Sequence, residues 1–196
     1  MNKNYIITGE QEICISCGIC CDGTLFGKAV LQQGEKGSLP EKIEENYFKT
    51  DKHEFFKLPC QYFDGKCTIY NKKKAVVCSA YKCKLLLRFS NGKIQKEEAL
   101  KIIQNVKSYK KEIEELAFIN FNLPKGTPFI TLQVQLNELK DSQKSSTSVK
   151  QLENIIAKCI ILEILLTKYF RTKEKFDEMI INPVSEDNRT EIHNGF

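Results

Sequence analysis

Apolar residues in the second half of the chain recur with the period of an α-helix. Between residues 99 and 117 they stand three or four positions apart, at Ala99, Ile102, Ile103, Val106, Tyr109, Ile113, Leu116 and Ala117. This spacing puts them on one face and predicts a helix of about six turns. Thr127 followed by Pro128 predicts the start of a second helix, which continues through Leu139.

A third helix is predicted over residues 149–170, after a polar loop at residues 140–148. Its main apolar stripe is formed by Leu152, Ile155, Cys159, Leu162, Leu166 and Tyr169, and five more residues widen it: Ile156, Ile160, Ile161, Ile164 and Leu165. So broad an apolar surface must be covered on more than one side. We expect the cover to come from a small helical bundle, a protein or peptide partner, or a second copy of this chain.

The first 95 residues show no helical period, and short apolar stretches alternate there with turn residues. We expect extended chain at Tyr5–Thr8, a strand within Thr24–Gln33 and a short helix within Glu41–Phe48. Asp64-Gly65 and Asn91-Gly92 predict tight turns between paired segments, the first with Cys60 and Cys67 on its arms. Residues 13–23 are expected to form a cysteine-rich loop, because Gly18 and Gly23 permit turns there.

These patterns predict an α+β fold in two parts. Residues 1–95 would form a small loop-rich domain with short hairpins, and residues 96–182 an all-helical region of three to four helices, with a short helix at 173–181. Residues 183–196 are expected to form a polar tail. The chain has 196 residues, of which 41% are hydrophobic and 28% charged, as in ordinary globular proteins. The N-terminus shows no signal-peptide pattern and residues 149–170 are interrupted by charges, so we expect a cytoplasmic protein without a membrane span.

Cysteine is the residue type that points most directly to chemistry. Eight of the nine cysteines fall in the first 83 residues: Cys14, Cys17, Cys20, Cys21, Cys60, Cys67, Cys78 and Cys83. In a reducing cytoplasm such a set indicates metal binding more than disulfides, so residues 1–95 are predicted to be a metal-bound domain. Cys159 stands alone on an apolar helix face, and we expect it to pack in the core.

The spacing of the first cysteines favours an iron–sulfur cluster. Cys14, Cys17 and Cys20 repeat the C-x-x-C interval, as in ferredoxin-type 4Fe-4S sites, which need a fourth thiolate from elsewhere in the chain. Zinc also accepts four thiolates and is the alternative, with room for two sites among eight cysteines. Neighbouring side chains diverge, so Cys20 and Cys21 are not expected to bind the same ion.

Positive charge gathers around the later cysteines. Residues 1–95 hold 15 Lys and Arg against 10 Asp and Glu, whereas residues 96–196 hold 15 of each sign. Between residues 60 and 88 one acid, Asp64, accompanies Lys66, Lys72, Lys73, Lys74, Lys82, Lys84 and Arg88. Lysines near thiolates stabilise them, and no nucleic-acid-binding motif accompanies the patch, so we do not expect a nucleic-acid partner.

Other polar residues give weaker signals. His53 lies between the cysteine groups without a second ligand at metal spacing, and His193 lies in the predicted tail. Glu112, Glu114 and Glu115 are expected on a solvated helix face. The sequence shows no nucleophile triad, phosphate-binding loop or zinc-protease motif, and leaves open whether the protein is an enzyme.

The cysteine pattern resembles that of a known family. The run Cys14-x2-Cys17-x2-Cys20-Cys21, followed by Pro59-Cys60, Cys67-x-Ile69-Tyr70 and Cys78-x4-Cys83, is similar to the YkgJ-like cysteine-cluster proteins, described as a zinc- or iron-chelating domain. The resemblance covers residues 12–88. A related domain occurs in flagellin lysine methylases, where it implies an iron–sulfur cluster. It therefore favours a cluster used for redox or in protein or peptide modification, by an enzyme or its accessory subunit; the alternative is a zinc-stapled interaction module without catalysis.

Overall fold

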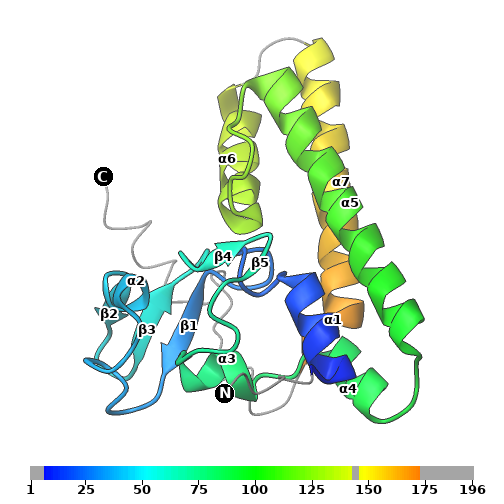
Figure 1. The fold of residues 1–196 in the computed structure, drawn as a ribbon. Coiled ribbons are helices and arrows are strands. Elements are labelled where there is room, and N and C mark those ends of the chain that lie inside the picture. Colours follow the sequence, from blue (N-terminus) through cyan, green and yellow to red (C-terminus); the bar gives the residue numbers. More distant parts are fainter. Residues whose placement is uncertain (1–6, 143–145, 173–196) are drawn as a thin grey trace.

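The computed structural model describes residues 7–142 and 146–172. In chain order its elements are α1 (Gly9–Cys17), β1 (Lys28–Leu31), α2 (Glu41–Glu44), β2 (Tyr47–Lys49), β3 (Glu54–Lys57), β4 (Phe63–Asp64), β5 (Lys66–Cys67), α3 (Val76–Ala80), α4 (Lys84–Ser90), α5 (Lys96–Phe121), α6 (Phe129–Ser142) and α7 (Ser146–Tyr169). Figure 1 shows the small sheet on one side of the molecule and the long helices α5 and α7 on the other. The α+β class is confirmed.

The sheet has three antiparallel strands in the order β1-β3-β2. Central β3 pairs Phe55 with Val30 of β1 and with Phe48 of β2. The predicted strand is confirmed over Lys28–Leu31 alone, and the predicted helix over Glu41–Glu44 alone. The chain turns to strand at Tyr47 because aromatic residues at 47 and 48 pair with those of β3.

The start of the predicted cysteine loop is a helix, so that prediction was wrong. Thr8 and Gln11 form a capping box: the Gln11 N–H donates to Thr8 Oγ1, and the Thr8 N–H donates to Gln11 Oε1. Ile13 is the one residue of α1 that is fully buried, so a helical period was not visible in the sequence. Gly18 ends the helix with a φ of 69°, in the left-handed region.

The three predicted long helices are confirmed as α5, α6 and α7. The polar loop predicted at 140–148 was wrong at both ends, because α6 runs to Ser142 and α7 starts at Ser146. Asn91-Gly92 follows helix α4, not a strand, so the hairpin predicted there was wrong. Tyr5 and Ile6, the helix at 173–181, the tail and His193 lie outside the described residues.

One hydrophobic core joins the helices to the cysteine-rich half. It includes Ile13 of α1, Leu85 of α4, Ile103 of α5 and Leu162 of α7. Cys159 is 4% exposed within this core, which confirms its predicted packing role. The division of the chain at residue 95 stays a prediction.

The broad apolar surface of α7 is covered in part by α5 and α6. Ile160, Ile161 and Ile164 remain 57%, 47% and 59% exposed. The partner or second copy predicted to cover this surface stays a prediction. Among the described helices, none has the length and apolar character needed to cross a membrane.

An ion-pair network ties the cysteine segment to α5. Lys110 Nζ lies 3.0 Å from Asp22 Oδ2 and 3.3 Å from Glu114 Oε1, and the three side chains are 16–18% exposed. Asp22 also accepts the Thr24 N–H through Oδ1 at 2.8 Å. Glu114 is therefore half-buried and paired, unlike the solvated residue predicted, whereas Glu112 and Glu115 lie on the exposed side of the helix.

We predict that Lys110→Ala lowers the free energy of unfolding by ~1 to 3 kcal/mol, because Asp22 and Glu114 lose the cation between them. The matched control is Lys111→Ala, which removes an exposed pair with Glu115 and should cost under ~0.5 kcal/mol. Urea denaturation of both variants measures the difference. Equal effects would show that the network does not hold the segment.

Candidate metal centre

The eight predicted ligands reach one region from four segments of the chain. Cys14 and Cys17 lie on α1, Cys20 and Cys21 in the turn after it, Cys60 and Cys67 around the β4–β5 hairpin, and Cys78 and Cys83 on α3 and at the start of α4. The Asp64-Gly65 turn predicted between Cys60 and Cys67 is confirmed. The Cys60 N–H donates to the Cys21 carbonyl at 2.8 Å and joins two segments distant in sequence.

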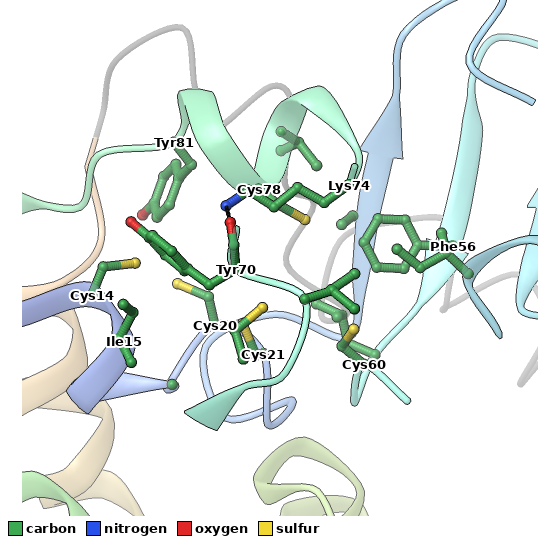
Figure 2. A pocket seen from close by; sticks show the side chains of 17 residues that line it. Cys14, Ile15, Cys20, Cys21, Phe56, Cys60, Tyr70, Lys74, Cys78 and Tyr81 are labelled. Carbon is green, nitrogen blue, oxygen red and sulfur yellow. Dashed lines mark hydrogen bonds between the residues drawn. The ribbon is translucent and has the colours of Figure 1, made fainter. Parts of the chain in front are cut away.

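These cysteines surround two adjoining cavities. The large cavity, of about 90 Å³, is lined by Cys14, Cys20, Cys21, Cys60, Cys67 and Cys78. Figure 2 shows it with its labelled side chains. The small cavity, of about 40 Å³, is lined by Cys14, Cys17, Cys20, Cys21 and Cys83. Because a single water needs roughly 10–15 Å³, both have room for more than one small ligand atom.

The neighbouring pair Cys20 and Cys21 lies between these cavities with different partners. After burial, which raises the pKa of both thiols, the strongest influences on Cys20 are the thiols of Cys83 and Cys17. The corresponding influences on Cys21 come from Cys78 and Cys60. The side chains of Cys20 and Cys21 were expected to diverge, and each interacts most strongly with a different group of thiols.

Burial and mutual repulsion disfavour the thiolate form of these cysteines. Burial raises the pKa of Cys83 to about 11, and burial together with Cys60 and Cys67 raises that of Cys78 to about 12. Cys78 is exposed at one side, although protein surrounds its sulfur on the others. A thiophilic cation placed between the sulfurs would offset both penalties, because its charge favours the thiolates.

Backbone N–H groups partly offset this burial at three of the sulfurs. They come from Ile19 for Cys17, from Tyr62 for Cys60, and from Leu85 and Leu86 for Cys83, and each lowers the pKa of its thiol. Such donors also stabilise thiolates bound to a metal or cluster and tune its potential. The donor set of this region therefore fits a metal–thiolate centre.

Lys74 is the basic residue that faces the thiols. Its Nζ donates to the Tyr70 carbonyl at 2.7 Å and lies 3.8 Å from the centre of the Tyr70 ring (Figure 2). Its charge lowers the pKa of Cys14 and Cys78, against the larger effect of burial. This agrees with the predicted internal role for part of the basic patch. Lys82 and Arg88 instead pair with Glu10 and Glu98, acids outside the patch.

A polar cleft of about 480 Å³ adjoins the large cavity. The two share Cys14, Tyr70, Lys74, Cys78 and Tyr81 as lining residues. The sequence did not identify Tyr70, Lys74 and Tyr81 individually as site residues, although their proximity to Cys67, Cys78 and Cys83 was a signal. The cleft gives the cysteine region an open side.

All nine cysteines are free thiols. No group of three or more His, Cys, Asp or Glu side chains within residues 7–142 and 146–172 is arranged so that it could hold a metal ion as it stands. His53 is exposed and lies edge-on to Phe55, and it lines neither cavity. Metal ligation by the eight cysteines thus stays a prediction, supported by their shared cavities.

Comparison with protein families, curated proteins and solved structures finds no match to this chain. The resemblance to the YkgJ-like family stays a prediction based on the cysteine pattern.

Gly18 provides a test of this geometry. A Cβ at this position would overlap the ring of Phe63, and its φ of 69° is unfavourable for other residues. We predict that Gly18→Ala reduces metal content and lowers the free energy of unfolding by ~2 to 4 kcal/mol, from backbone strain plus overpacking.

Gly92→Ala is the matched control, because Gly92 has a φ of 67° but no atom within 4 Å of a Cβ. It should cost only the backbone strain of ~1 to 2 kcal/mol and leave metal content unchanged. Metal analysis and urea denaturation compare the two variants. Full metal content in Gly18→Ala would contradict the role of this turn.

Proposed function

We propose that this protein binds a 4Fe-4S cluster through Cys14, Cys17, Cys20 and Cys83. The observation that supports it most is the place of Cys83. The C-x-x-C-x-x-C run needs a fourth thiolate, and Cys83 lines the same small cavity as all three cysteines of the run. Four thiolates around a space larger than one ion suit a cluster.

The surroundings of the small cavity are consistent with such a cluster. Apart from the cysteines and Tyr81, its lining is mainly Ile, Leu, Phe and Gly. An apolar shell excludes water from a cluster and influences its reduction potential. When bound, the cluster supplies one-electron redox chemistry.

We propose that this chemistry serves electron transfer or the modification of a protein or peptide, by this protein or by an enzyme it assists. The polar cleft supports this role, because it leads from the surface to Cys14, which also lines the small cavity. A partner bound in this cleft would lie beside the cluster. The YkgJ-like cysteine pattern agrees with this proposal.

Zinc is the second candidate. A set of four cysteines is also the common ligand set of a structural zinc site, and both cavities are lined by at least four. The protein would then be a stapled interaction module without redox chemistry.

Anaerobic purification followed by iron, inorganic sulfide and zinc analysis distinguishes the two. We predict a brown protein with equal amounts of iron and sulfide, whose colour is bleached by dithionite. Colourless protein containing zinc and no sulfide would overturn the cluster in favour of the zinc module.

Substitution of one ligand gives a second test. Cys17→Ser should remove the cluster in the small cavity and unfold part of the first 95 residues, because metal binding and folding are coupled in such segments. Cys159→Ala is the control: it should keep the metal and cost ~1 to 2 kcal/mol of stability. Unchanged metal in Cys17→Ser, or its loss in Cys159→Ala, would contradict the ligand assignment.

A further inference from the structure

We infer that Cys21, Cys60, Cys67 and Cys78 hold a second iron–sulfur cluster, next to the first but separate from it. The identity of the metal rests on the proposed function. The division of the eight cysteines into two sets of four rests on the cavities and the backbone.

The cavities assign five cysteines directly. Of these two cavities, Cys17 and Cys83 line the small one and not the large one. Cys60, Cys67 and Cys78 line the large one and not the small one. The three others, Cys14, Cys20 and Cys21, line both. Two complete sets of four therefore require two of these three in the small cavity and one in the large.

Cys21 is the one that belongs to the large cavity. Its carbonyl accepts the Cys60 N–H, so the backbone fastens it to the segment that carries two ligands of that cavity. Among the thiols, Cys78 and Cys60 raise the pKa of Cys21 most, whereas Cys83 and Cys17 raise that of Cys20 most. Cys14 and Cys20 then complete the C-x-x-C-x-x-C set in the small cavity.

The vicinal pair explains how two centres fit so close together. Adjacent residues direct their side chains apart, so two neighbouring cysteines can each supply a ligand to a different cluster. The same pair would be redundant in a protein with one cluster and four ligands. Eight cysteines and two cavities match two four-thiolate centres without remainder.

The second centre would be the more accessible of the two. Cys78 is exposed, and it lines both the large cavity and the polar cleft. Lys74 also lines both the large cavity and the polar cleft, whereas it does not line the small cavity. A partner in the cleft would therefore lie beside one ligand of each cluster, Cys78 of the second and Cys14 of the first.

Iron analysis of matched variants tests this division. We predict about eight irons per wild-type chain after anaerobic reconstitution, four for each cluster. Cys21→Ser and Cys60→Ser should each keep the cluster of the small cavity, and Cys20→Ser and Cys83→Ser the other, so all four retain about half of the iron. Cys159→Ser should retain all of it.

Wild-type protein gives a test that does not depend on the folding of variants. Reduction of both clusters should give an electron paramagnetic resonance spectrum broadened by interaction between two nearby spins, as their ligands are adjacent residues. A single isolated spin with about four irons per chain would overturn the second centre and leave the first intact.

The identity of the bound metal shows whether this inference or the proposed function has failed. Two zinc ions per chain, one of them lost in each ligand variant, would overturn the clusters but support two centres. Indistinguishable spectra of the remaining metal in Cys20→Ser and Cys21→Ser would overturn the division itself.

Discussion

The structure around the cysteines depends on holding thiol groups together away from water. Burial raises the pKa of Cys14, Cys17, Cys20, Cys21, Cys60, Cys78 and Cys83, and neighbouring thiols raise several of them further. A bound cation would offset these penalties, so metal binding and folding should be coupled in this region. The helices provide the frame: α1 packs on α5, and the N–H of Lys84, next to Cys83, donates to the Phe170 carbonyl after α7.

The sequence suggested that the helices after residue 95 form a separate part of the chain. Contacts from these helices nevertheless help to position the candidate site. Lys110 on α5 pairs with Asp22, the residue after Cys21, and Lys107 donates to the Ser16 carbonyl, beside Cys17. Phe170 lines the small cavity, and its carbonyl also accepts the Tyr81 hydroxyl at 3.2 Å. The long helices thus position both ends of the cysteine region, whatever else their exposed apolar surface does.

The long helices were predictable from the sequence because their apolar residues repeat over many turns. The grouping of the cysteines in the site was not predictable in this way. Residues 99–117 repeat the helical period over many turns, but α1 is short and buries only Ile13, so its capping box was the one local signal. The spacing of Cys14, Cys17 and Cys20 indicated a shared site. It did not say which later cysteine lies in one cavity with all three, because Cys60, Cys67, Cys78 and Cys83 were equally available; in the fold this cysteine is Cys83. Lys74 was one of the seven basic residues between residues 60 and 88 until its place beside the thiols was known.

We propose that these thiolates are the protein's iron ligands and that no other side chain binds iron. X-ray absorption at the iron K-edge of the anaerobic holoprotein tests it most directly. We predict a first shell made of sulfur alone, together with an iron–iron shell from a cluster. Nitrogen or oxygen in the first shell, or iron without iron neighbours, would contradict it.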